Sequence, residues 1–267
     1  MRLPVTLLIP GGRRLLAAAL IGAAALTAAA QQPALELRLP TANDAIFQKG
    51  GPDFYQFVDR TFEGQKSTPW EGGKFGFTRD PRRVGSRIVM TRFHEGLDIK
   101  PVQRDKAGEP LDDVVAMSAG RVVHASDTPS HSNYGRYVVV EHNWGQGPFY
   151  SLYAHLNAIR VAAGDSVQAG QPLGRLGYTG AGIDKRLAHL HVELNLIWSS
   201  QFQRWYDAGG FSTPNRHSLF NGMNLIGLDL AGLFLARQKN PALTPAEFIA
   251  QAEPYFEVTV PGSAEME

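Results

Sequence analysis

The chain has 267 residues, of which 43% are hydrophobic and 19% are charged, a composition typical of a globular protein of one or two domains. Its 28 glycines and 17 prolines indicate many turns, and therefore short strands rather than a helical bundle. The absence of cysteine excludes structural disulfides, thiolate metal sites and cysteine nucleophiles. Any metal must therefore be held by histidine and carboxylate side chains.

Residues 1–30 have the features of a secretory signal peptide. Arg13-Arg14 precede an apolar run that ends at Leu26, and small residues stand at positions −3 and −1 of a predicted cleavage after Ala30. The alternative is an uncleaved membrane anchor, but the run is shorter than the ~20 residues that span a bilayer. We expect an exported protein, periplasmic or extracellular, with no stable membrane span after cleavage.

Removing the signal changes the charge balance. The segment carries three arginines and no acidic residue, so 23 basic side chains remain against 25 acidic ones. The formal net charge falls from +1 to −2. Nothing in this balance favours a polyanion-binding protein, and no nucleic-acid partner is expected.

Residues 31–85 are predicted to be an N-terminal extension that packs on the main domain and forms one wall of a cleft. Turn-forming residues cluster at 40–44 and 49–53. Residues 70–77, which begin at a tryptophan and contain three glycines, predict a hairpin or an aromatic-bearing loop. We interpret the aromatic residues around position 55 as packing anchors.

Residues 86–199 are predicted to form the core domain, with a mainly β fold. Short runs rich in β-branched and aromatic residues are bounded by turn residues. These runs cover residues 87–90, 120–124, 136–141 and 149–155. Many short strands with tight turns predict a compact antiparallel β-sheet or an open, barrel-like sandwich.

Residues 200–267 are predicted to be a partly helical C-terminal extension. Thr244, Pro245 and Glu247 form a helix start, with Thr244 as the N-cap, proline at the first helical position and glutamate closing a capping box. Residues 225–236 are apolar enough to be a buried helix or strand against the sheet. We expect a structural role for this region.

The segment around His189 and His191 carries the first chemical signal. Polar and apolar residues alternate from position 188 to 194, as in a β-strand. Side chains at i and i+2 leave one face of a strand, so His189, His191 and Glu193 project together. Two interpretations stay open for this motif alone: a metal-binding pair, or two solvent-facing histidines on an amphipathic strand.

A second histidine stands near a carboxylate earlier in the chain. His94 and Asp98 are four residues apart and are separated by Gly96, which tolerates the dihedral angles of a bend. Alone they could be a surface turn, but with His191 they complete a His-Asp-His set. Three protein ligands and an open position are typical of catalytic zinc, which lowers the pKa of water to about 7.

A hydrolytic zinc site also needs side chains that move protons. His155 and His189 are the candidates, because histidine titrates near neutrality and can accept the proton of water or donate to a leaving amine. We expect Glu193 to support the site rather than to bind metal. The remaining histidines have no partner at ligand spacing and are assigned structural or surface roles: His124, His131, His142 and His217.

The order of these motifs resembles the lysostaphin-like zinc metallopeptidases over about residues 86–197. The motifs are His94-x-x-x-Asp98, Tyr153-Ala-His155-Leu156, Gly170-Gln171-x-x-Gly174, Gly177-x-Thr179-Gly180 and His189-Leu190-His191-x-Glu193. The resemblance implies an endopeptidase that cuts peptide cross-links or bridges of bacterial peptidoglycan. It implies one zinc ion per chain ligated by His94, Asp98 and His191, with catalytic roles for His155 and His189, in a groove of an antiparallel β core.

Two segments depart from the family pattern. Residues 103–113 form a polar insertion that could border the cleft, and residues 181–187 lack the Gly-Pro approach to the histidine pair. Both departures leave the ligands in place but bear on substrate preference. They leave open which peptide bond is cut, between stem peptides or within a glycine bridge.

Two other functions compete with the zinc peptidase. The first is a non-catalytic scaffold of the same fold that binds peptidoglycan or activates another wall hydrolase. The second is a biotinyl or lipoyl carrier, which the turn pattern of residues 164–174 resembles, although the Met-Lys pair of such carriers is absent. The complete His-Asp-His set favours the enzyme.

Overall fold

The computed structural model describes residues 35–48 and 51–253. Within these ranges no helix is long and apolar enough to cross a membrane. The predicted signal peptide, residues 1–30, lies outside the described residues.

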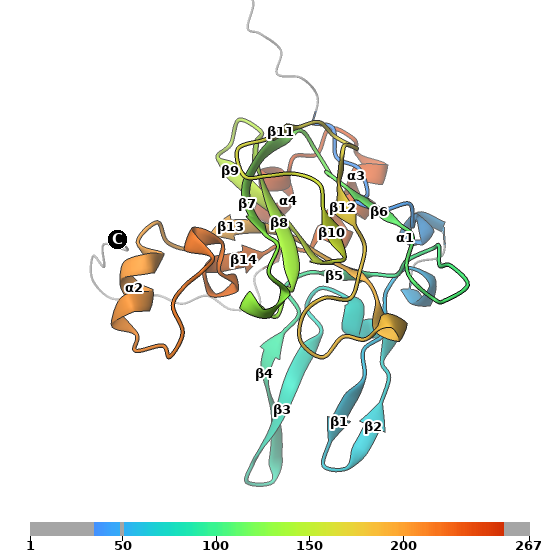
Figure 1. Ribbon diagram of the computed structural model, residues 1–267, viewed down its shortest axis with the longest axis vertical. Helices are drawn as coiled ribbons and strands as arrows, with labels where there is room; N and C mark the ends of the chain where they lie inside the picture. The colour runs from blue at the N-terminus through green and yellow to red at the C-terminus, as the bar shows by residue number, and fades with distance from the viewer. Residues whose placement is uncertain (1–34, 49–50, 254–267) are drawn as a thin grey trace, which may run out of the picture. The chain divides into compact units, whose positions relative to one another are not determined.

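The largest sheet in the described residues has seven antiparallel strands in the order β11-β7-β8-β9-β13-β14, with β5 also paired to β13 (Figure 1). Its strands are β5 (Leu97–Ile99), β7 (Gly120–Ser126), β8 (Arg136–Asn143), β9 (Pro148–Leu156), β11 (Ser166–Val167), β13 (Leu190–Ile197) and β14 (Leu225–Gly227). β9 pairs along one edge of β13, and β5 and β14 pair with different parts of its other edge. The central strand of the site, β13, is therefore paired on both sides.

A second sheet of three short strands packs against one face of the first. It consists of β6 (Asp113–Val115), β10 (Ala158–Ile159) and β12 (Pro172–Arg175). Val114 and Leu173 from this sheet share a fully buried core with Val138 and Leu190 from the large sheet. Each such side chain contributes about 1.5–3 kcal/mol relative to an exposed one. The antiparallel, mainly β architecture without a closed barrel confirms the predicted fold class.

Both faces of strand β8 are buried. Val138 and Val140 face the main core, whereas Tyr137 and Val139 face a second cluster that is covered by Phe220. The C-terminal region that supplies this cover contains α2 (Phe202–Ala208) and the 3-10 helix η5 (Ser218–Phe220). This two-sided burial explains why residues 136–141 form a nearly continuous apolar run rather than an alternating one.

The helix predicted to begin after Thr244 is confirmed. Thr244 caps α4 (Pro245–Ala250): its Oγ1 accepts from Glu247 N at 3.2 Å, and Glu247 Oε2 accepts from Thr244 N at 2.8 Å.

Residues 225–236, predicted to be a buried helix or strand, contain both: strand β14 is followed by helix α3 (Leu230–Lys239). The other helices are α1 (Ala45–Gln48), η1 (Gly51–Asp53), η2 (Trp70–Gly73), η3 (Pro129–His131), η4 (Lys185–Leu187) and η6 (Gly222–Asn224).

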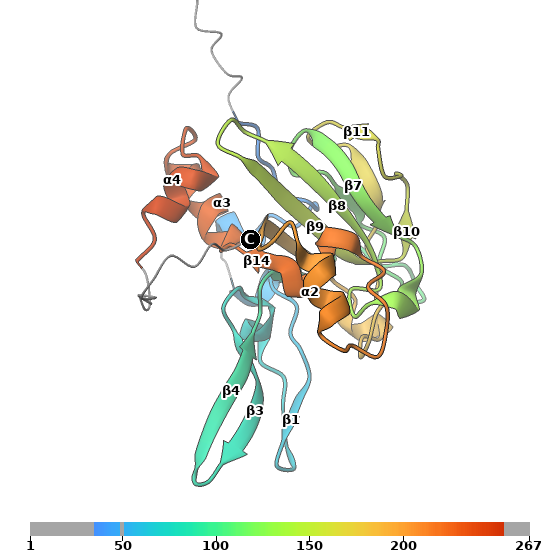
Figure 2. The ribbon, with the colours of Figure 1, turned by 90° about the vertical axis from the view of Figure 1, so that its left-hand side faces the viewer.

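Two hairpins project from the same side of the sheet, as Figures 1 and 2 show. They are β1 (Arg60–Phe62) with β2 (Gln65–Ser67), and β3 (Thr78–Val84) with β4 (Arg87–Phe93). Glu63 at the turn of the first hairpin forms an ion pair with Arg83 of the second. Between them, residues 70–77 contain η2 and a loop rather than a hairpin, which decides between the two forms predicted.

Candidate metal centre and active site

The register of β13 brings the predicted site residues together. His191 pairs directly with Asp98 on β5 and with Ala154, the neighbour of His155, on β9. His94 follows the last residue of β4 and lies four residues before Asp98. Side chains that are 93 and 97 positions apart in the sequence therefore meet, because β5 and β13 are neighbours in one antiparallel sheet.

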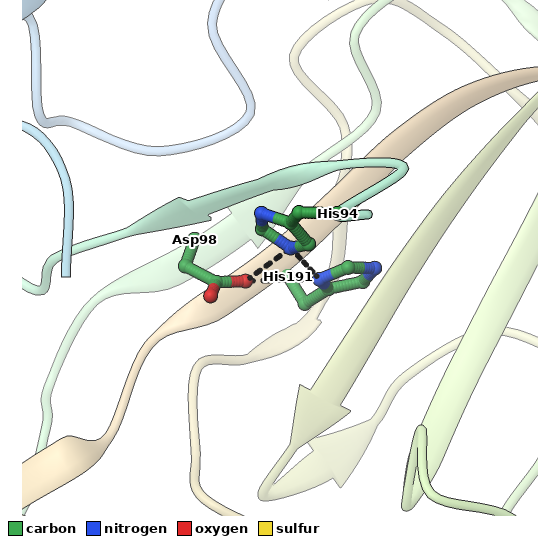
Figure 3. A group of neighbouring side chains, drawn as sticks. All are labelled: His94, Asp98 and His191. Atoms are coloured by element: carbon green, nitrogen blue, oxygen red, sulfur yellow. Dashed lines mark hydrogen bonds and ion pairs between the residues drawn. The ribbon is translucent and has the colours of Figure 1, made fainter. Parts of the chain in front are cut away.

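His94, Asp98 and His191 turn toward one another (Figure 3). The Nε2 atom of His94 lies 3.1 Å from Asp98 Oδ1 and 3.0 Å from His191 Nδ1. His191 Nδ1 lies 2.9 Å from the same Oδ1 atom. Ligand atoms around a tetrahedral zinc are about 3.3 Å apart, so this triangle of donor atoms is close to the size that zinc requires.

The outer nitrogen of each histidine fixes its tautomer. His94 Nδ1 donates to the carbonyl of Lys74 at 2.9 Å, and His191 Nε2 donates to Glu193 Oε1 at 2.7 Å. The lone pairs of His94 Nε2 and His191 Nδ1 are then directed at the space beside Asp98. Metal-binding histidines characteristically donate their other N–H in this way, so the set fits a zinc ion.

Charge within the cluster also favours a cation. Burial alone would raise the pKa of Asp98, but the neighbouring imidazoles of His94 and His189 hold it well below its usual range. Burial lowers the pKa of His191, yet hydrogen bonds to Asp98 and Glu193 raise it to about 9. The two carboxylates thus stabilise a positive charge at this position.

Glu193 is held by three hydrogen bonds. Besides accepting from His191, its Oε1 accepts from Tyr134 Oη at 2.9 Å and its Oε2 accepts from Asn195 Nδ2 at 2.8 Å. Burial raises its pKa, whereas the bonds from His191, Asn195 and Tyr134 lower it more. An ionised Glu193 therefore orients the His191 ring, as expected of a supporting residue.

His155 and His189 lie beside the cluster, with ring centroids 4.8 Å apart in an edge-on arrangement. Their Nδ1 atoms donate to the carbonyls of Thr179 and Leu187 at 2.8 and 2.6 Å. The Nε2 atom of His189 lies 3.4 Å from Asp98 Oδ1. Burial lowers the pKa of both rings, so each is neutral at pH 7 and can accept a proton at Nε2.

His155 is held in a strained backbone conformation. Its φ is +62°, in the left-handed region, which costs about 1–3 kcal/mol for a residue other than glycine. The surrounding loops are closely packed: a Cβ atom on Gly135 would lie 2.4 Å from the carbonyl carbon of Thr179, whose oxygen accepts from His155. Such strain is common at functional sites.

Two cavities flank His191. One, of about 410 Å³, is lined by His155, His189 and Asp98, and the other, of about 650 Å³, by His94 and Glu193. The N-terminal extension supplies residues 57–60 to the first cavity and so forms part of its wall. Residues 181–184 also line it, whereas the insertion 103–113 lines neither cavity.

Some residues of the site carry no sequence signal. Tyr134, which binds Glu193, lies in a loop before β8, and Arg60 and Arg79 lie on the two hairpins, yet all three line both cavities. Long-range packing alone places them there.

The reason predicted for Gly96 was wrong, because its φ is not left-handed. Glycine is needed there for space: a Cβ atom would lie 2.7 Å from the carbonyl oxygen of Val192.

Two of the other histidines form hydrogen bonds in the interior. His142 Nε2 lies 2.7 Å from Ser151 Oγ, and His217 Nδ1 lies 2.7 Å from Tyr137 Oη. Both histidines are buried, and neither belongs to the His-Asp-His group. Their contacts agree with a structural role.

Comparison with known proteins gives one family match. Residues 92–202 match the model of peptidase family M23. The outer membrane antigenic lipoprotein B of Haemophilus influenzae is 34% identical over 90 residues, which is 34% of this chain and 20% of that protein. The match thus spans about a fifth of the length of this relative.

Similar solved structures include a zinc containing peptidase from Vibrio cholerae, 26% identical over 52% of this chain and 35% of that chain, with a TM-score of 0.34. The catalytic domain of the antimicrobial peptidase lysostaphin from Staphylococcus simulans is 26% identical over 46% of this chain and 80% of that chain, with a TM-score of 0.32. The structure of the SpoIIQ–SpoIIIAH pore forming complex is 20% identical over 61% of this chain and 84% of that chain, with a TM-score of 0.36. All three TM-scores are below 0.5, so these structures are reported as similarities alone.

Proposed function

We propose that the protein, whose residues 92–202 match the model of peptidase family M23, is an exported zinc endopeptidase that hydrolyses peptide cross-links of bacterial cell-wall peptidoglycan. One observation carries the proposal. The His-Asp-His cluster, with both histidine tautomers fixed for metal binding, lies beside two buried, neutral histidines in a cavity. A structural metal site would need neither the cavity nor the additional pair.

In this proposal His94 Nε2, Asp98 Oδ1 and His191 Nδ1 hold one zinc ion. When bound, zinc supplies a Lewis acid that polarises a peptide carbonyl and makes water nucleophilic at neutral pH. Glu193 and the carbonyl of Lys74 keep the two imidazoles in the required tautomers.

His155 and His189 move the protons. Each is anchored at Nδ1 by a backbone carbonyl, which leaves Nε2 to accept a proton from the attacking water. Because burial disfavours the imidazolium form, the protonated ring readily gives the proton to the leaving amine. A protonated ring also donates a hydrogen bond that stabilises negative charge on the carbonyl oxygen.

The main alternative is a non-catalytic scaffold of the same fold that binds peptidoglycan or activates another wall hydrolase. It requires neither zinc nor the two neutral histidines, so the complete set of side chains favours the enzyme. Zinc content and hydrolysis of purified sacculi distinguish the two functions.

Three substitutions test the assigned roles. The His155→Ala and His189→Ala variants should retain one zinc ion per chain and lose activity by about 10²–10⁴-fold, the usual contribution of a general acid or base. His191→Ala should lose both zinc and activity. A zinc-free wild-type protein that leaves sacculi intact would contradict the enzyme proposal and favour the scaffold.

A further inference from the structure

Two arginines on the projecting hairpins face the active site. Arg60 begins β1 and Arg79 lies on β3, and both line the 410 Å³ cavity and the 650 Å³ cavity. Both residues are half-buried. They therefore lie between the two cavities that flank His191, where a peptide bound across the metal cluster would pass.

Neither guanidinium has a partner of its own. Within residues 35–48 and 51–253, Arg60 and Arg79 make no side-chain hydrogen bond and no ion pair, and the Nε atom of each is buried without an acceptor. Other arginines nearby are paired: Arg83 with Glu63, Arg92 with Asp80 and Arg186 with Asp59. Among the described residues, three arginines line the two cavities, and of these Arg92 is paired whereas Arg60 and Arg79 are not.

The nearest carboxylates are already engaged. Asp98 Oδ1 lies 2.9 Å from His191 Nδ1 and 3.1 Å from His94 Nε2, and Glu193 accepts hydrogen bonds from His191, Tyr134 and Asn195. In the described ranges neither carboxylate forms an ion pair with an arginine. The acids of the metal cluster therefore do not occupy the two guanidinium groups.

A half-buried cation without a partner is unfavourable, because it has lost water without gaining an acceptor. Burial lowers the pKa of Arg79, and the negative charges of Asp98, Asp80 and Glu193 offset this effect only in part. An anion in the cavity would offset the cost, and the planar guanidinium matches the geometry of a carboxylate.

We infer that Arg60 and Arg79 bind a free carboxylate of the peptide substrate, close to the bond that is cut. The inference deepens the proposed peptidase function and rests on it. It selects among substrates: stem peptides of peptidoglycan carry free carboxylates, whereas a glycine bridge carries none along its length. The protein should therefore prefer stem-peptide cross-links.

A matched pair of peptides tests this selectivity. One is a cross-linked stem-peptide dimer with free carboxylates, and the other is the same dimer with those groups converted to carboxamides. Binding is measured by calorimetry on the full mature chain loaded with zinc, in the His155→Ala background so that the peptide is not consumed. Zinc content and the unfolding temperature are recorded for every variant.

The carboxylate dimer should bind at least about tenfold more tightly than the carboxamide dimer, the effect of one charge-assisted hydrogen bond. Arg60→Gln with Arg79→Gln should abolish that difference and leave zinc content unchanged. Arg82→Gln, on the same strand as Arg79 but exposed, is the control for the loss of one charge and should retain the difference.

Equal binding of the two dimers to the His155→Ala protein, with Arg60 and Arg79 intact, would overturn the inference, even if the double variant failed to fold. A preference that survives in a folded double variant would overturn it as well. Calorimetry measures peptide binding without hydrolysis, so its result does not depend on whether the protein is a peptidase. Protein with His155 intact that binds the carboxylate dimer selectively but does not cut it would refute the peptidase while supporting the arginine site.

Discussion

At the scale of residues, the role of each histidine depends on what its free nitrogen faces. His94, His155 and His189 share one tautomer, because each donates from Nδ1 to a backbone carbonyl. The Nε2 atom of His94 lies within 3.1 Å of Asp98 Oδ1 and 3.0 Å of His191 Nδ1, at the centre of the cluster. The same tautomer can therefore serve a metal ligand at one position and a proton acceptor at another.

Glu193→Gln should weaken zinc binding by about 10–100-fold, the usual effect of removing a partner of a metal ligand. The carboxylate makes His191 a better metal ligand and fixes its tautomer, and an amide cannot supply the charge. Competition titration with a chelator measures the affinity.

Glu95→Gln is the control for the loss of a nearby carboxylate, with both variants titrated above pH 8, because burial and the charge of Glu193 raise the pKa of Glu95 to about 7. Glu95 lies between His94 and Gly96, and in the described part of the chain its side chain makes no hydrogen bond to a histidine. Zinc affinity should therefore change little. An equal loss in both variants would show that overall charge, rather than the bond to His191, controls the affinity.

At the scale of elements, the site depends on how closely the turn before β5 approaches β13. A Cβ atom on Gly96 would lie 2.7 Å from the carbonyl oxygen of Val192 and 2.9 Å from His191 Cε1. Glycine is therefore required by the close approach of the two segments, and this approach holds His94 and Asp98 against His191.

Gly96→Ala should destabilise the protein by about 1–3 kcal/mol, because the added methyl group overpacks a rigid backbone contact. It should also weaken zinc binding, since β5 must move away from His191. Thermal unfolding and zinc titration measure the two effects. An unchanged unfolding temperature together with unchanged zinc affinity would contradict the proposed role of this turn.

The sequence predicted those parts of the site that depend on local pattern. The period-two alternation around His191 indicated the strand and its polar face, and the spacing of His94 and Asp98 indicated the second half of the cluster. Arg60, Arg79 and Tyr134 could not be predicted, because their positions depend on how hairpins and loops far apart in the sequence pack around the cavities.

At the scale of the whole molecule, metal binding and folding should be coupled. The cluster joins β13 to β5 and to the end of β4, and its three ligand side chains are buried. A cation that binds these ligands in the folded chain, and binds the unfolded chain weakly, shifts the equilibrium toward the folded state.

Zinc at about 100 times its dissociation constant should therefore stabilise the mature protein by about 2.7 kcal/mol. Differential scanning calorimetry with zinc and with a chelator measures the shift. Magnesium should have little effect, because it prefers oxygen ligands. A zinc-induced shift of the same size in His191→Ala would place the stabilising ion elsewhere.

The most direct test of the central claim is mass spectrometry of cross-linked muropeptides after incubation with the zinc-loaded mature protein. We predict that dimers disappear and that products appear whose summed mass exceeds that of the dimer by one water, and that a chelator or His191→Ala prevents this. Dimers that remain intact with the zinc-loaded protein would contradict the claim that this site is a peptidase.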